Sequence, residues 1–331
     1  MPQPVIERHL TARDLVESLR RDVRDGLTGP VRSVPPKWGY DERGSELFEQ
    51  ITRLGEYHLT RAERSILTAR AAELAALTGA DTLIELGAGS GEKTRLLLDA
   101  LGDAGHLRSY VPVDVSGDFL ADAARRIGAD YPGLSVRAIV ADFEGDLGVL
   151  PDEGRRLVAF LGSTAGNMSP VERLSFYSRL RTAMRPGDAL LLGLDLVMDP
   201  DRLDAAYDDA LGLSAEFNRN LLHVINRELD ADFVPDLYEH VSLWDPDAEC
   251  VRRRLRASTD QQVLIRDLDL EVRFAAGEEI DTEISDKFRR GEVREELRLA
   301  GFDPVRWWTD LPGDFALCLA VPSPEAARPT G

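Results

Sequence analysis

Residues 82–101 read TLIELGAGSGEKTRLLLDAL. The stretch begins with a short apolar run at 82–86, turns through three glycines, and continues as a helical pattern over 92–101. A strand, a tight turn and a helix in this order present backbone N–H groups at a helix N-terminus, which is where open α/β sheets bind ligands. The stretch therefore predicts the first strand of a Rossmann-like sheet and a ligand site directly after it.

The spacing of the glycines indicates which ligand binds there. Glu85, Gly87, Gly89 and Gly91 follow one another at every second position, whereas a dinucleotide-binding turn places its third glycine three positions after the second. Glu92 occupies that position here, and an acidic side chain beside a pyrophosphate is unfavourable. The pattern thus disfavours a nicotinamide dehydrogenase. It favours S-adenosyl-L-methionine, a cofactor without phosphates whose methionine moiety Gly87 and Gly89 allow the backbone to approach.

Further strands and helices alternate on the C-terminal side of this stretch. Apolar runs at 108–116, 134–143, 155–163 and 188–197 predict strands, with helical patterns between most of them. This alternation predicts an α/β fold with a doubly wound, mainly parallel sheet. The runs at 304–310 and 315–322 predict an antiparallel pair that closes the sheet. Thr60 and Glu63 form a capping-box pattern at the start of a helical stretch over 60–78.

The alternation is interrupted after residue 195. Residues 198–229 predict two helices, and the runs at 237–244, 249–259, 261–268 and 270–277 predict strands of a mixed or antiparallel sheet. The acidic stretch 278–288 predicts a loop. We therefore expect a methyltransferase domain that binds S-adenosylmethionine, made of 62–195 and 288–322. A second, α+β substrate-binding domain would comprise 1–61 and 196–287.

Composition limits the possible partners. The chain has 331 residues with 59 acidic and 40 basic side chains, a formal charge of -19. Such a balance disfavours nucleic acid and anionic membrane surfaces. The chain has no apolar run approaching 18 residues, no secretion signal and no CxxC or HxxxH spacing. We expect a cytoplasmic monomer without a metal site.

Polar residues at the predicted strand ends supply candidate contacts for the cofactor. Asp114 ends the second strand and is suited to accept hydrogen bonds from both ribose hydroxyls. Asp142 ends the third strand, where it would accept from the adenine amino group, and Phe143 would stack near the ring. Lys93 follows the glycine turn and would pair with the cofactor carboxylate. Carboxyl ends of strands are where open α/β sheets bind ligands.

The fourth predicted strand ends in LGSTAGNM, residues 161–168. Its small residues, including Gly162, leave room where a substrate would meet the methyl group. Asn167 is both donor and acceptor, which suits the amine and carboxylate of an amino acid. This end of the strand is therefore the predicted substrate contact.

Six longer motifs make the prediction more specific. They are KWGYDERGSELFEQIT (37–52), EYHLTR (56–61), ELGAGSGEKTR (85–95), FLGSTAGN (160–167), AYDDALGLSAEFNRN (206–220) and AAGEEIDTEISDKF (275–288). Together they resemble the bacterial histidine Nα-methyltransferases of ergothioneine biosynthesis, and the resemblance covers roughly residues 10–321. It implies that three S-adenosylmethionine molecules methylate L-histidine to Nα,Nα,Nα-trimethylhistidine, hercynine.

The resemblance also implies roles for single residues. Its cofactor positions are Gly87, Lys93, Asp114, Asp142 and Phe143, and its substrate positions are Tyr57, Asn167, Tyr207, Glu283 and Ser285. By this likeness, Asn167 and Tyr207 hold the amino and carboxylate end. Glu283 and Ser285 hold the imidazole, which Tyr57 borders. Tyr40 resembles a tyrosine near the amine that acts through water, so Tyr40 and Asn167 are the expected catalytic residues.

The sequence departs from the family pattern in three places: EYHLTR (56–61), where His58 and Leu59 replace Tyr-Pro, the glycine turn AGSG (88–91), and one basic segment. CVRRRLRA, residues 250–257, is unusually basic, and Arg253 within it is positioned to alter the choice of substrate side chain. Two alternatives therefore stand beside histidine methylation. One is a related N-methyltransferase acting on another amino acid. The other is a non-catalytic ligand-binding protein on the same fold.

Overall fold

The computed structural model describes residues 4–89, 91–143, 145 and 147–324. The chain divides into two compact units. Unit 1 comprises Met1–His9, Arg61–Val197 and Phe288–Gly331, and unit 2 comprises Leu10–Thr60 and Met198–Lys287.

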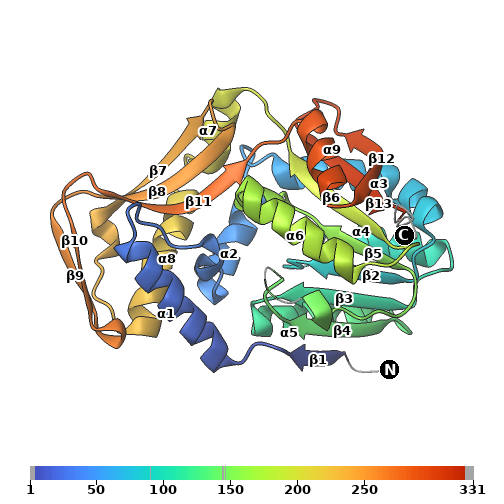
Figure 1. The fold of residues 1–331 in the computed structure, drawn as a ribbon, viewed down its shortest axis with the longest axis horizontal. Helices are drawn as coiled ribbons and strands as arrows, with labels where there is room; N and C mark the ends of the chain where they lie inside the picture. The colour runs from blue at the N-terminus through green and yellow to red at the C-terminus, as the bar shows by residue number, and fades with distance from the viewer. Residues whose placement is uncertain (1–3, 90, 144, 146, 325–331) are drawn as a thin grey trace, which may run out of the picture. The chain divides into compact units, whose positions relative to one another are not determined.

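Unit 1 is built on one eight-stranded sheet (Figure 1), in the order β1-β4-β3-β2-β5-β6-β13-β12. Its strands are β1 (Val5–Arg8), β2 (Thr82–Leu86), β3 (Ser109–Asp114), β4 (Ser135–Val140), β5 (Arg156–Phe160), β6 (Ala189–Asp195), β12 (Phe302–Thr309) and β13 (Phe315–Pro322). The first six pair in parallel, and β13 pairs antiparallel with both β6 and β12. The predicted Rossmann-like sheet and its antiparallel closing pair are confirmed. The chain leaves β2 toward β3 and returns on its other side as β5, which creates a topological switch point at the end of β2.

Helices of unit 1 cover this sheet. They are α3 (Leu59–Thr78), α4 (Thr94–Asp103), α5 (Gly117–Asp130), α6 (Pro170–Ala183) and α9 (Arg290–Leu299), with short 3-10 turns η2 (Leu147–Val149) and η3 (Thr164–Asn167). Figure 1 shows α6 and α9 in front of the strands, where Phe176, Leu180 and Leu297 join the apolar core beneath them. Because the central strands are buried along their whole length, they carry the continuous apolar runs of a parallel sheet.

Strand β1 differs from the sequence-based expectation. The prediction grouped residues 1–61 with the insertion, whereas Val5–Arg8 pairs in parallel with β4. Arg137 is paired with Val5, and its side chain reaches diagonally to Glu7, with which it forms a bidentate ion pair with N–O distances of 2.6 and 2.8 Å. A four-residue edge strand with only two apolar side chains has too weak a hydrophobic pattern to be read from sequence.

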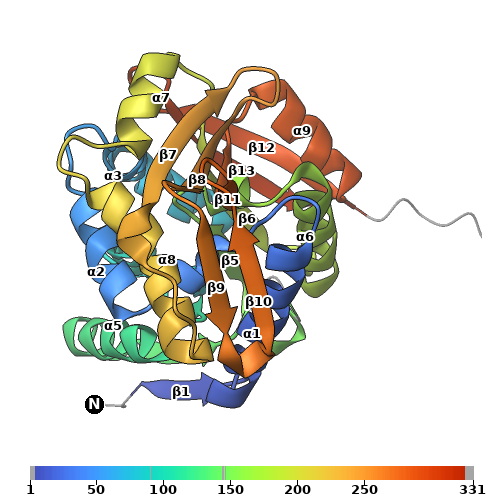
Figure 2. The ribbon, with the colours of Figure 1, turned by 90° about the vertical axis from the view of Figure 1, so that its left-hand side faces the viewer.

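Unit 2 combines helices with two antiparallel sheets (Figure 2). Its helices are α1 (Ala12–Thr28), α2 (Glu42–Ile51), α7 (Pro200–Tyr207) and α8 (Leu213–Leu229), with 3-10 turns η1 (Pro36–Gly39), η4 (Pro235–Leu237) and η5 (Arg266–Leu268). One sheet has the order β11-β8-β7, formed by β7 (Tyr238–Asp245), β8 (Cys250–Ala257) and β11 (Glu279–Asp286). The other is the hairpin of β9 (Gln261–Ile265) and β10 (Leu270–Phe274). Apolar residues of α1, α8 and both sheets share one core.

The prediction of a loop at 278–288 is wrong, because β11 occupies most of this stretch. Its partner β8 explains the error. Arg254 donates to Asp281 at 2.7 Å and to Glu279 at 3.0 Å, and Arg256 donates to Glu279 at 2.8 Å. Cross-strand charge pairs thus replace the apolar alternation by which a strand is normally recognised.

The buried ion pair between Arg156 and Asp188 offers a test of the unit 1 fold. Arg156 is 1% exposed, and its guanidinium also donates to the carbonyls of Pro151 and Ala183 at 2.8 Å. Replacing it in Arg156→Met leaves the Asp188 carboxylate buried without its cation. We expect a loss of about 3–5 kcal/mol in the free energy of unfolding, measured with urea.

The neighbouring residue supplies a matched control. Arg155 is exposed and donates through its side chain to the carbonyl of Gly187. Arg155→Met should change the unfolding free energy by less than about 1 kcal/mol. Equal losses in the two variants would show that the buried pair has no special role.

Candidate functional site

The turn after β2 has the backbone conformation that its glycines predict. Gly87, Gly89 and Gly91 have φ angles of +71°, +52° and +71°, a region that residues with a Cβ atom rarely adopt. The N–H of Gly87 donates to the carbonyl of Val113 on β3 at 2.9 Å. A Cβ atom at Gly89 would meet no atom within 4 Å. The turn therefore brings bare backbone to an open position beside the end of the sheet.

The buried carboxylate of Glu85 is bonded to elements on both sides of this turn. Glu85 is 4% exposed, and its Oε2 accepts from the hydroxyls of Thr94 at 2.6 Å and Tyr110 at 2.7 Å. These bonds tie β2 to the first residue of α4 and to β3. Burial raises the pKa of Glu85 to about 7, although both hydroxyls favour the charged form.

Asp114 lies beside the turn, at the end of β3 as predicted. Its carboxylate accepts from the N–H of Gly89 at 3.3 Å and from the N–H of Ser116 at 3.0 Å. Burial raises the pKa of this carboxyl, while the backbone donors lower it. The carboxylate is thus fixed directly against the glycine turn.

Phe143 and Asp142 follow β4 by a few residues. The ring of Phe143 packs edge-on against Phe160 at 5.4 Å between centroids, and a Cβ atom at Gly87 would lie 3.7 Å from it. Asp142 is half-buried, and its carbonyl accepts from the N–H of Gly145. Phe143 is therefore positioned beside the glycine turn.

Lys93 forms an ion pair with Glu63 of α3, and Glu63 also accepts from the N–H of Gly162 at 2.9 Å. Glu63 is fully buried, so its carboxylate joins the glycine turn to the end of β5. Gly193 makes room for it, since a Cβ atom there would lie 2.1 Å from Glu63 Oε1. The sequence suggested Glu63 as a helix cap, but α3 begins at Leu59 and Glu63 points into the unit.

Asn167 is half-buried in η3, which follows β5.

Unit 2 gathers the tyrosines that the family resemblance singles out. Tyr40 packs edge-on against Phe48 at 5.4 Å and against Phe217 at 5.0 Å, and Phe48 in turn contacts Tyr57 at 6.1 Å. Burial, followed by the nearby Tyr207, raises the pKa of the Tyr57 phenol well above 10. The phenol of Tyr57 therefore stays neutral at physiological pH.

Tyr207, Ser285 and Lys287 form a second, polar group in unit 2. The Tyr207 hydroxyl lies 2.9 Å from Ser285 Oγ, and the Lys287 ammonium donates to Tyr207 at 2.9 Å and to Ser285 at 2.6 Å. The resemblance assigned Ser285 to the imidazole and Tyr207 to the other end of the substrate. In the structure the two hydroxyls are bonded to each other and share one buried cation.

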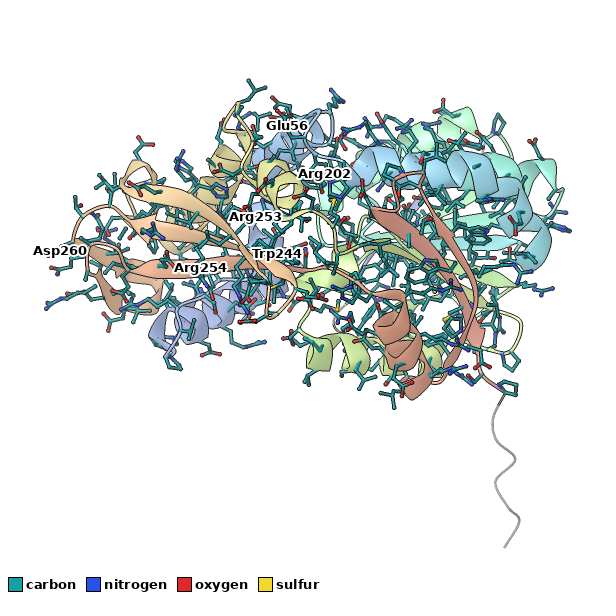
Figure 3. The ribbon with its side chains drawn as sticks, turned by 90° about the horizontal axis from the view of Figure 1, so that it is seen from above. Glu56, Arg202, Trp244, Arg253, Arg254 and Asp260 are labelled. Carbon is teal, nitrogen blue, oxygen red and sulfur yellow. The ribbon has the colours of Figure 1, made fainter. Side chains whose placement is uncertain are left out.

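Glu283 reaches the same face of the sheet because β11 contains a bulge. Register shifts between Asp281 and Glu283, so Asp281 pairs with Arg254 while Glu283 pairs with Arg253. Figure 3 shows Arg253 and Arg254 leaving β8 on opposite sides. Arg253 forms an ion pair with Glu283 and lies over the rings of Tyr207 at 5.6 Å and Phe217 at 5.4 Å. A bulge that redirects a side chain is typical of active sites.

Sequence reasoning identified the tyrosines, Glu283 and Ser285 but missed several of their partners. Lys287 was detectable, because Glu283, Ser285 and Lys287 follow the period of two that places them on one face of a strand. Phe48 and Phe217 look like ordinary core residues. Among the residues that the structure describes, no group of histidine, cysteine and acidic side chains could hold a metal ion. Within the same described residues, no helix is long and apolar enough to cross a membrane.

The sheet topology and the glycine turn with its acidic partner define a Rossmann-type S-adenosylmethionine-dependent methyltransferase. Residues 19–322 match the family described as "Histidine-specific methyltransferase, SAM-dependent". The chain belongs to this family.

Curated relatives agree with this assignment. The chain is 55% identical over 316 residues to the histidine N-alpha-methyltransferase of Mycolicibacterium smegmatis, covering 96% of this chain and 98% of that one. It is 54% identical over 304 residues to the enzyme of the same name from Mycobacterium tuberculosis, covering 92% and 95%. Ergothioneine biosynthesis protein 1 of Neurospora crassa is 30% identical over 85% of this chain and 32% of its own length.

The raised pKa of Glu85 predicts a pH-dependent contribution to stability. Since the folded-state pKa of about 7 lies above the ordinary value of 4.5, the folded protein binds the extra proton. The contribution of Glu85 is therefore most favourable below pH 4.5 and is lost as the pH rises toward 7. The full difference is about 3 kcal/mol.

The variant Glu85→Gln keeps an acceptor oxygen and removes the titration. Urea unfolding of both proteins between pH 4.5 and 8 should show the unfolding free energy of the wild type falling relative to that of the variant, up to pH 7. A constant difference across this range would mean that the Glu85 carboxyl is not shifted.

Proposed function

We propose that this protein transfers methyl groups from S-adenosylmethionine to the α-amino nitrogen of L-histidine and forms hercynine, the first step of ergothioneine biosynthesis. The observation that carries the proposal is the cluster in unit 2. In a chain that belongs to the histidine-specific family, Tyr40, Tyr57, Tyr207, Glu283 and Ser285 come together on one side of the β11-β8-β7 sheet.

Unit 1 is proposed to bind the methyl donor, and the residues present fit it. Gly87 and Gly89 leave bare backbone for the methionine moiety, and the Asp114 carboxylate suits the ribose hydroxyls. Phe143 and Asp142 would contact the adenine. Lys93 would share its charge between Glu63 and the carboxylate of the donor. When bound, the sulfonium of the donor supplies an electrophilic methyl group.

Unit 2 is proposed to bind the amino acid. Glu283 would accept a hydrogen bond from the imidazole, with Ser285 as its neighbour on β11 and Tyr57 against the ring. Tyr207, supported by the Lys287 ammonium, would hold the carboxylate of the substrate. Asn167 and Gly162 of unit 1 are proposed to contact its amine.

The chemistry requires a neutral amine, although an α-amino group is largely protonated at physiological pH. Tyr40 is the proposed residue for proton release, acting through a water molecule. Positioning of the amine in line with the methyl group is the main catalytic contribution. The product is a fixed cation, and the tyrosine rings of unit 2 offer the negative faces that such cations prefer.

We also propose that the chain acts in the cytoplasm as a monomer. Both cysteines, Cys250 and Cys318, are buried free thiols, as suits a reducing compartment. Size-exclusion chromatography with light scattering tests the oligomeric state.

Mass spectrometry tests the function. The purified protein is incubated with S-adenosylmethionine and all twenty amino acids, and we expect a gain of three methyl groups on histidine alone. Methylation of a different amino acid would support the alternative of a related N-methyltransferase. Cofactor binding without any methylation would support a ligand-binding protein.

The Asp114→Asn variant tests the cofactor site separately. Removing a charged acceptor from the ribose costs about 1.5–3 kcal/mol, so the Kd for S-adenosylhomocysteine measured by calorimetry should rise about tenfold to a hundredfold. Asp118→Asn is the matched control, since Asp118 is fully exposed and pairs only weakly with Arg8 at 3.2 Å. An unchanged Kd in Asp114→Asn would remove Asp114 from the site.

A further inference from the structure

Three polar side chains form a row across the sheet of unit 2. Ser242 on β7 is directly paired with Arg253 on β8, and Arg253 is directly paired with Glu283 on β11. Directly paired residues point to the same face of a sheet. The row therefore lies on the face that also carries Tyr207 and Ser285.

The row has an acceptor but leaves donors without partners. Arg253 is 6% exposed, and among the described residues no acceptor lies within hydrogen-bond distance of its Nε. The same holds, within those residues, for the buried Oγ of Ser242. A buried donor without a partner costs about 1–3 kcal/mol, which a bound ligand with a lone pair removes. The row is therefore complementary to a side chain that offers an acceptor and a donor together.

Within the row, Arg253 and Glu283 form an ion pair, and the groups that surround them are as follows. Three tyrosines face Arg253: Tyr40 directly after η1, Tyr57 just before α3, and Tyr207 of α7. His240 of β7 accepts at Nδ1 from Asn218 and donates from Nε2 to the carbonyl of Tyr207, at 2.9 and 3.0 Å.

Burial and then the charge of Arg253 lower the pKa of His240, which favours its neutral form. Asp208 lies at 4.0 Å from its Nε2 but is mostly exposed. Lys287 directly follows β11, and its ammonium donates to the hydroxyls of Tyr207 and Ser285. The row thus presents a Glu283 carboxylate already paired with the Arg253 guanidinium, not a bare carboxylate.

We propose that Arg253 is a specificity-determining residue that selects the neutral form of the substrate's imidazole. Its Nε–H donates to the unprotonated ring nitrogen, while Glu283 accepts from the ring N–H. An imidazolium has no lone pair for Arg253 and is repelled by the guanidinium, so the pair rejects it. The inference rests on the proposed function, because it takes histidine as the substrate.

Calorimetric titration of L-histidine tests the inference without requiring turnover. Binding is measured from pH 5.5 to 7.5 in the presence of S-adenosylhomocysteine, for the wild type, Arg253→Met and Arg254→Met. The neutral fraction of an imidazole with a pKa of about 6.5 changes roughly tenfold over this range. The wild type should therefore bind histidine about tenfold more tightly at pH 7.5 than at pH 5.5.

The variants separate the role of Arg253 from general charge effects. Arg253→Met leaves Glu283 as a bare carboxylate that prefers imidazolium, so its affinity should be higher at pH 5.5 than at pH 7.5. Arg254, on the opposite face, pairs with Asp281 and Glu279, so Arg254→Met should keep the wild-type profile. The substrate's α-amino group titrates in every variant alike, so differences between variants report the side chain.

A double variant guards against misfolding and against titration of His240. Arg253→Met/Glu283→Gln has no buried charge in the row and should bind histidine with no inversion of the profile. If the inversion persisted there, it would come from His240 and the inference would be wrong. A wild-type profile in Arg253→Met, or no binding of histidine by the wild type, also overturns it. Failure to methylate histidine despite the expected binding profile would overturn the proposed function alone.

Discussion

The arrangement of the glycine turn in unit 1 depends on one buried carboxylate. Glu85 lies at the centre of the sheet, on the strand that pairs with both β3 and β5, and it bonds to Thr94 and Tyr110. These two bonds fix the start of α4 and the neighbouring strand relative to β2. The glycines between them then have little freedom except the positive φ angles observed. A buried acid with a pKa near 7 is unfavourable for stability, and its use here indicates that holding the turn outweighs that loss.

In unit 2, the arrangement of the candidate site depends on a single extra residue in β11. Side chains alternate along a strand, so without the shift at Thr282, Glu283 would share a face with Asp281 and lie opposite Arg252. Thr282 is buried, and its hydroxyl donates to the carbonyl of Arg253 at 3.0 Å, which stabilises the irregular backbone. One face of the sheet consequently keeps the ion pairs of Arg254 with Asp281 and Glu279. The other face carries Glu283, Ser285 and Lys287 of the candidate site.

Much of unit 1 was predictable because its signals are local. The glycine spacing, the apolar runs and the acid at the end of β3 are each visible within ten residues of sequence, and parallel strands place their ends at one edge. The role of Glu63 was not predictable, since its partners are 30 and 99 positions away and Gly193 provides the space it occupies. The sequence alone does not distinguish a glutamate of a capping box from a buried glutamate that forms an ion pair.

Less of the structure of unit 2 could be predicted from the sequence, for a related reason. Strand β11 alternates acids with a few apolar residues, and only its pairing with the arginines of β8 makes it a strand. The family resemblance supplied Tyr40, Tyr57, Tyr207, Glu283 and Ser285. The bulge and the partnership of Ser285 with Tyr207 became visible only in the structure. Long-range pairing of charges leaves no periodic trace in one sequence.

Each unit brings a carboxylate to its candidate site together with a cation, Glu63 with Lys93 and Glu283 with Arg253. Buried ion pairs contribute little net stability, because the loss of hydration offsets their attraction. What they provide is a fixed direction for hydrogen bonds. A ligand that enters such a site must offer groups that the pair can bind without leaving either charge alone, and a ligand of the wrong charge cannot do so. In the proposed function the pairs therefore act as filters for the charge of a ligand, which is the property that an enzyme needs when substrate and product differ by the protonation and methylation of nitrogen.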